Sequence, residues 1–199
     1  MLFIFDMGGV VTTTANFYPR LSKLLGISLD EFYQLCEGEG AFDKRGNILE
    51  AYSDGKISPE DFWKIFSSRK PHMHVNTPWF HWLFHPVPVE GTAELVLDLK
   101  AKGHRVVVGT NTCQSHYLNH LERGDYALFD QTYTSHLMGI SKPDPDFWKL
   151  ILLAEDCKAE DAVFVDDKQE NVDGAAALGI HSYKFQSAAE LRKAWAQWL

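Results

Sequence analysis

Five short runs of apolar and β-branched residues, spread over the whole chain, constrain the fold more than any other feature. Most of them lack alternation between apolar and polar residues, and each is bounded by Gly, Asp, Asn or Pro. Such uninterrupted runs are typical of strands buried on both faces of a parallel sheet. The runs lie at residues 2–5, 105–108, 131–134, 162–165 and 182–185.

Helical patterns lie between or after these runs. They cover residues 92–101, 145–153, 172–178 and 188–199, and the third stops at Gly179, a residue suited to a helix end. Strands that alternate with helices of roughly ten residues predict βαβ units. We therefore expect a Rossmann-like α/β fold, an open parallel sheet with helices on both faces.

Residues 16–86 depart from this alternation, because their patterns are consecutive helices with no strand between them. A helical domain inserted after the first strand would lie over the carboxyl end of the sheet, where such folds bind ligands. We predict two domains, an α/β core of residues 1–15 and 87–199 and a helical cap of residues 16–86. The expected cap helices are 18–25, 29–37, 48–53, 59–66 and 78–84.

Charge and cysteine content narrow the cellular setting. The 199 residues include 27 acidic and 19 basic side chains, a net charge of −8, and no dense basic run, so we expect no nucleic-acid partner. The amino terminus lacks the basic segment of a signal peptide, and the uncharged residues 71–89 hold four His and four Pro, unlike a membrane span. Three Cys at unrelated spacings suit a reducing compartment. We expect a soluble cytoplasmic protein, a monomer or homodimer, that binds no membrane.

Acidic residues follow two of the predicted strands. Asp6 stands between the first run and two glycines, and Asp166 and Asp167 follow the fourth run. Each of them could simply shape a turn. However, two strands of one sheet that end in carboxylates bring like charges together, and this arrangement requires a proton or a cation. Mg²⁺, which takes a few carboxylates and several waters, is the simplest candidate.

Two further segments carry groups suited to a phosphate. The second run leads into Thr110 and Asn111, which offer a hydroxyl and backbone N–H groups to an anion. Lys142 lies in a turn-rich segment with prolines one and three residues later, which would hold the charge in place. An ordinary turn and an ordinary surface lysine remain the alternatives.

In the order Asp, Thr, Lys and Asp-Asp, these segments resemble the four motifs of the haloacid dehalogenase superfamily of phosphohydrolases. The resemblance spans the whole chain, and the helical insertion is similar to the family's C1-type cap. Within the superfamily the chain looks most like the glucose-1-phosphate phosphatase-like branch, near the N-terminal phosphatase domain of soluble epoxide hydrolase. The motifs are residues 5–10, 107–111, 142–143 and 164–167, with Asn171 following the last.

The resemblance implies a Mg²⁺ site. Its ligands would be the carboxylate of Asp6, the backbone carbonyl of Gly8 and the carboxylate of Asp167. Asp166 and Asn171 would lie near or behind the metal, as a secondary ligand and an outer partner.

The resemblance also implies a phosphate site and a nucleophile. Asp6 would attack phosphorus and become a phosphoaspartyl intermediate. Thr110 and the backbone of Asn111 would hold phosphate oxygens, and Lys142 would neutralise the charge on Asp6 and the phosphate. A loose phosphoryl transition state depends mainly on such positioning and charge neutralisation.

One position departs from the family pattern. Phosphatases of this superfamily usually have a second Asp two residues after the nucleophile, as the acid that protonates the leaving group, and here that residue is Gly8. Proton transfer of this kind contributes ~10²–10⁴-fold to rates. Asp43, Lys44 or solvent could replace it.

These observations support three functions. The first is a Mg²⁺-dependent phosphatase acting on a small phosphorylated metabolite, for example a sugar phosphate. The second is a phosphate-binding or regulatory protein with little turnover, because the acid is missing at Gly8. A haloacid dehalogenase is less favoured, since attack on carbon needs no cation site.

The segment 72–85 is rich in His and aromatic residues, and its role stays open. A metal site is not favoured, because no acidic or Cys residue accompanies the His at ligand spacing. Its aromatic residues fit a cap core better than a substrate wall.

Overall fold

The computed structural model describes residues 1–14, 16–37, 47–70 and 73–199. Its centre is one parallel sheet with the strand order β3-β2-β1-β4-β5, which confirms the predicted α/β class. Observed strands differ from the predicted ones by at most two residues at an end. They are β1 (Leu2–Phe5), β2 (Arg105–Thr110), β3 (Gln131–Thr134), β4 (Ala162–Asp166) and β5 (His181–Lys184).

Burial differs between the middle and the edges of the sheet. The three central strands β2, β1 and β4 are buried almost throughout, as their unbroken apolar sequences predict. The edge strands β3 and β5 are only partly buried, so burial on both faces was predicted wrongly for them. Each edge strand has a neighbour on one side only, which leaves part of it in contact with solvent.

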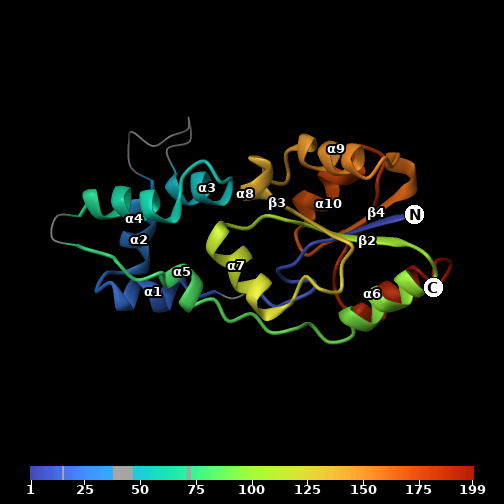
Figure 1. Cartoon of the computed structure of the whole chain (residues 1–199), viewed down its shortest axis with the longest axis horizontal. Helices are drawn as coiled ribbons and strands as arrows, with labels where there is room; N and C mark the ends of the chain where they lie inside the picture. Colours follow the sequence, from blue (N-terminus) through green and yellow to red (C-terminus); the bar gives the residue numbers. More distant parts are fainter. Residues whose placement is uncertain (15, 38–46, 71–72) are drawn as a thin grey trace.

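Helices cover both faces of the sheet (Figure 1). Side chains of β1 alternate between two clusters. Phe3 and Phe5 pack on one side with residues of α6 (Thr92–Ala101) and α11 (Ala188–Ala194). Leu2 and Ile4 pack on the other side with residues of α9 (Pro145–Ala154) and α10 (Gln169–Ala176). A short 3₁₀ turn, η1 (Ala159–Asp161), precedes β4.

Two helices were missed by the sequence patterns, α7 (Gln114–Arg123) and α8 (Ser135–Met138). α7 has no apolar stripe: Leu118 and Leu121 are exposed, whereas Ser115 and His120 are buried. Tertiary contacts with the cap bury its polar residues, and apolar periodicity cannot reveal such a helix.

The insertion forms a group of helices at the end of the molecule opposite the two termini (Figure 1). Side-chain caps from Ser28, Asn47 and Ser58 start three of them. Their apolar side chains form a cluster separate from those of the sheet, joined by Cys113 from the core. The helices are α1 (Tyr18–Leu24), α2 (Leu29–Cys36), α3 (Ile48–Ser53), α4 (Pro59–Ser68) and α5 (Trp79–Trp82).

The division into a core of residues 1–15 and 87–199 and a cap of residues 16–86 stays a prediction. Within the described part of the chain, no helix has both the length and the apolar character that crossing a membrane requires.

Candidate active site

The predicted site residues come from the carboxyl ends of three adjacent strands. Asp6 follows β1, Thr110 ends β2 and Asp166 ends β4. β1 lies between the other two strands, and Phe5 pairs in register with Val108 on one side and Val165 on the other. Parallel pairing in this register brings the three polar side chains to one edge of the sheet.

Lys142 reaches this edge from the loop before α9. Its Nζ donates to Asp6 Oδ1 at 2.8 Å, to Asp166 Oδ2 at 2.6 Å and to the carbonyl of Gly109 at 2.9 Å. Only 1% of its side chain is exposed. A surface lysine is therefore excluded, and the amine joins the ends of β1, β2 and β4.

Asn111 holds the backbone of Lys142 in place. Its side-chain amide accepts a hydrogen bond from Lys142 N and donates one to Lys142 O, both at 2.8 Å. The sequence suggested a role only for the backbone of Asn111, at a phosphate. Local spacing does not show this second role, because the two residues are 31 positions apart.

Asp166 is fully buried and its two oxygens are occupied. Oδ2 accepts from Lys142 and from Asn171 Nδ2, the latter at 2.9 Å, and Oδ1 accepts from the backbone N–H of Lys168 at 2.8 Å. Asp166 therefore fixes the position of Lys142. Asn171 contacts this carboxylate, which is compatible with the outer place predicted for it.

Burial and charge shape the ionisation of the cluster. Burial raises the pKa of Asp6 above 3.8; Lys142 opposes this rise, and the charge of Asp166 adds to it. Burial and Asp166 likewise raise the pKa of Asp167. Burial alone would lower the pKa of Lys142, but Asp6 and Asp166 outweigh it and raise that pKa above 10.5, so the amine stays charged.

The same carboxylates fit a divalent cation. Asp6, Asp166 and Asp167 each place an oxygen within 4.8 Å of the others. Three carboxylates around one ammonium carry two negative charges in excess, and hard oxygen donors are the ligands that Mg²⁺ prefers.

Gly9 lets Asp167 approach the cluster, a requirement that the sequence did not reveal. Its φ is +84°, and a Cβ there would lie 2.5 Å from Asp167 Oδ2. Glycine adopts such a backbone without strain. Gly8 is different: a Cβ at Gly8 would have Thr14 Oγ1 as its nearest neighbour, at 3.7 Å, an ordinary contact.

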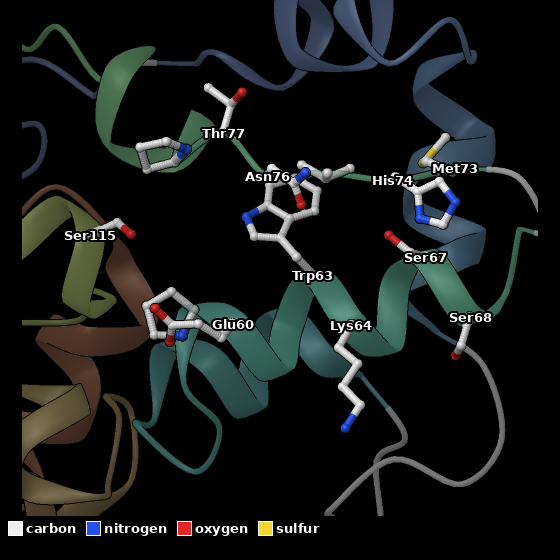
Figure 2. A pocket seen from close by; sticks show the side chains of 13 residues that line it. Glu60, Trp63, Lys64, Ser67, Ser68, Met73, His74, Asn76, Thr77 and Ser115 are labelled. Carbon is white, nitrogen blue, oxygen red and sulfur yellow. The ribbon is translucent and has the colours of Figure 1, made fainter.

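A cavity of about 290 Å³ opens beside the nucleophile. Gly8, Thr110 and Asn111 line it together with several threonines and with ring-bearing residues, among them Phe17, Phe84 and His116. A larger cavity of about 790 Å³ runs along α4, where Trp63 points towards the segment that carries Asn76 (Figure 2). Gly8, Thr110 and Asn111, at the carboxyl ends of β1 and β2, line the smaller cavity and not the larger one, so the smaller one is the candidate substrate pocket.

Other expectations have mixed outcomes. Asp43 and Lys44, the suggested proton donors, lie outside the described residues. Phe80 and Phe84 lie in the cap core, as predicted, and Phe84 also lines the smaller cavity. Trp82 is exposed instead. His81 pairs with Glu122 at 3.0 Å, and the acidic cluster above is the metal-competent group within the described residues.

Comparisons with known proteins bear on the family of this chain. The family model described as haloacid dehalogenase-like hydrolase matches residues 1–179. A sesquiterpene phosphatase of Aspergillus oryzae, astK, is 30% identical over 181 residues, 89% of this chain and 85% of the relative.

Solved structures share the fold. A HAD family enzyme of Bacteroides thetaiotaomicron matches with a TM-score of 0.79, 20% identity and coverage of 97% of both chains. The wild-type form of that enzyme in complex with magnesium and inorganic phosphate matches with a TM-score of 0.72, 22% identity and coverage of 94% of both chains. Each comparison covers most of the chain, as the sequence motifs do.

Proposed function

The chain belongs to the haloacid dehalogenase-like hydrolases, and on that premise we propose that it is a Mg²⁺-dependent phosphatase acting on a small phosphate monoester. The observation that carries the proposal is the buried ammonium of Lys142 between Asp6 and Asp166, inside an acidic cluster that opens onto a cavity. The name of the fungal relative and the magnesium and phosphate bound by the bacterial neighbour support the same activity.

Asp6 is the proposed nucleophile. A carboxylate oxygen of Asp6 forms a bond to phosphorus while the bond from phosphorus to the leaving oxygen breaks. Water then attacks phosphorus, which releases phosphate and restores the carboxylate. The net reaction consumes one water and yields an alcohol and phosphate, and the covalent intermediate divides one difficult step into two easier ones.

Lys142 and its neighbours prepare this attack. The Nζ–Oδ1 hydrogen bond orients Asp6, and the fixed positive charge attracts the phosphate. Asn111 fixes the backbone of Lys142, and Asp166 fixes its amine. Thr110 would donate to a phosphate oxygen.

Asp6, the Gly8 carbonyl and Asp167 would hold the cation, with Asp166 and Asn171 behind them. When bound, Mg²⁺ supplies charge stabilisation for the phosphoryl group. The remaining acidic charge of the cluster suits this role, because Lys142 balances only one of three carboxylates.

The missing acid at Gly8 affects the departing alcohol. Gly8 supplies no carboxylate, so the leaving oxygen would take its proton from solvent or from another group such as Asp43 or Lys44. Aryl, acyl and anomeric sugar phosphates, whose leaving groups are acidic, should react faster than simple alkyl esters. The same gap supports the second candidate, a protein that binds phosphate esters with little turnover.

Release of phosphate from p-nitrophenyl phosphate, with Mg²⁺ or with EDTA, tests the proposal. A phosphatase releases phosphate only with the metal. Metal-dependent binding of inorganic phosphate without any turnover would establish the binding protein instead. Release of halide from a haloacid without metal would establish a dehalogenase.

A further inference from the structure

The walls of the 290 Å³ cavity are aromatic. Phe17 comes from the segment before α1, Phe84 from the segment after α5 and His116 from α7. Among the described lining residues Lys168 is the one permanent charge, and it is exposed at the surface. Thr13, Thr14 and Thr112 add hydroxyl groups to the lining.

The rings support one another. His116 stacks on Phe84 with centroids 4.0 Å apart and meets Phe17 edge-on at 5.3 Å. His120 meets the same Phe84 edge-on at 5.0 Å and lies 5.4 Å from Tyr126. The apolar walls are therefore formed before any ligand enters, as is usual for pockets that bind small molecules.

Two of the lining residues carry a buried polar atom that lacks a partner in the described part of the chain. Tyr126 Oη and His116 Nε2 are buried and have no hydrogen-bond partner among the described residues. Tyr126 is only 8% exposed, and burial raises the pKa of its hydroxyl. Burial lowers the pKa of His116 to about 3, so its ring is neutral and hydrogen-bonds without carrying charge.

Buried polar atoms without a partner are rare in folded proteins, and each calls for an explanation. These two belong to residues that line the cavity beside the nucleophile, where a bound ligand supplies the missing partner. Neutral groups among rings match a ligand with a hydrogen-bonding group on an otherwise apolar body.

We infer that the substrate of the proposed phosphatase is the phosphate monoester of a mainly hydrocarbon alcohol that carries one further hydrogen-bonding group, held by Tyr126 and His116. This inference rests on the proposed function. It replaces the sugar phosphate suggested by the sequence with a different class of leaving group.

Three primary alkyl phosphates test the inference with leaving groups of similar acidity: glucose 6-phosphate, cyclohexylmethyl phosphate and 4-hydroxycyclohexylmethyl phosphate. We expect kcat/KM to rise in that order, with the hydroxylated hydrocarbon at least about tenfold above the sugar, since one polar contact to a matching site changes selectivity by this amount or more. An equal or higher value for glucose 6-phosphate would overturn the inference.

Two matched variants locate the polar contact. Tyr126→Phe should reduce the preference for the hydroxylated over the plain cyclohexylmethyl ester towards one. Tyr117→Phe removes a hydroxyl from a ring that packs 5.5 Å from Tyr126 but does not line the cavity, so it should keep the wild-type ratio. A ratio that survives both Tyr126→Phe and His116→Leu would show that these atoms do not bind the substrate.

A binding measurement separates this inference from the proposed function. The phosphonate analogues of the three esters cannot be hydrolysed, and their affinities can be measured by calorimetry with Mg²⁺ present. If p-nitrophenyl phosphate is not hydrolysed, the phosphatase proposal fails, yet the same order of affinities still supports the apolar pocket. Active enzyme that binds the sugar phosphonate as tightly as the others overturns the inference alone.

Discussion

The acidic cluster and the aromatic cavity meet at the same loops but consist of different kinds of side chain, charged in the cluster and mainly ring-bearing along the cavity. In the cluster, carboxylates surround Lys142, whose side chain is 1% exposed, and charge is balanced by charge. In the cavity, rings pack on rings, and two neutral polar atoms lack partners. The cluster suits the phosphoryl group common to all phosphate esters, and the cavity suits the part in which esters differ.

The two regions also differ in how the chain supplies them. The carboxylates of the cluster lie at or just after the ends of strands, so each comes with a short local motif. The rings of Phe17, Phe84 and His116 in the cavity come from three separate segments around α1, α5 and α7. Chemistry and selectivity should therefore respond separately to substitution, and the following predictions test that separation.

Asp6→Asn should have the largest effect on the cluster. It removes the attacking oxygen and a metal ligand, and turnover should fall by at least about 10³-fold, as for loss of other catalytic nucleophiles. The amide keeps the shape of the carboxylate, so the melting temperature should show that the fold survives. Retention of more than a few per cent of wild-type activity would contradict the covalent mechanism.

Lys142→Met should be costly for stability. It leaves Asp6 and Asp166 buried without their shared cation, and breaking a buried ion pair from one side costs about 3–5 kcal/mol. Urea unfolding without metal measures the loss. Lys168→Met removes an exposed lysine nearby and should cost far less; equal losses would mean that the buried ammonium does not hold the cluster together.

Gly8→Asp tests the missing acid. The structure has room for a Cβ at Gly8, and a carboxylic acid there should speed hydrolysis of alkyl esters by up to about 10²–10⁴-fold. Wild-type turnover should depend steeply on the acidity of the leaving group, and the variant should flatten that plot. A flat plot for the wild type, with chemistry rate-limiting, would mean that another group supplies the proton.

Gly9→Ala is the matched control for this pair of glycines. Its Cβ would meet Asp167 and its backbone has a positive φ, so the substitution should weaken Mg²⁺ binding and lower stability. Calorimetric titration with Mg²⁺ compares the two variants. Equal affinities in Gly8→Asp and Gly9→Ala would show that Asp167 does not need the space at Gly9.

Mg²⁺ should give a smaller, graded effect. Binding to the folded state alone adds about 2.7 kcal/mol at a hundredfold excess over Kd. Asp167→Ala should remove most of the resulting rise in melting temperature, whereas Asp161→Ala, at the opposite end of β4, should keep it. A melting temperature that changes neither with Mg²⁺ nor with the Asp167→Ala substitution would mean that the carboxylates form no common site.

The pH dependence of the metal-free protein follows from the same carboxylates. The folded state raises the pKa of Asp6 and Asp167 above 3.8, so it binds protons more readily than the unfolded chain. This contribution to stability is complete below pH 3.8 and is lost as the pH rises through the raised values. Mild acidification from pH 7 should therefore stabilise the metal-free protein relative to the Mg²⁺-saturated one; a constant difference would contradict it.

Much of the fold and the cluster was predictable because its signals are local. The unbroken apolar runs of β1, β2 and β4 predicted a parallel sheet, since only strands covered on both faces can be apolar throughout. The carboxyl ends of parallel strands meet at one edge, so Asp6, Thr110 and Asp166 could be placed together before any coordinates were known. For these residues, the position along the strand decides the position in space.

What the tertiary structure alone decided depends on contacts between distant segments. The hydrogen bond between Asn111 and Lys142 joins residues 31 positions apart. Glycine is needed at Gly9 because the side chain of Asp167 occupies the place of a Cβ there. The sequence did not predict α7, because the cap buries polar residues of this helix. The cavity forms between this helix and the cap residues Phe17 and Phe84. The spacing of apolar residues along one segment indicates which of its side chains face the core and which face solvent. Which other segment covers those side chains depends on the packing of the whole chain.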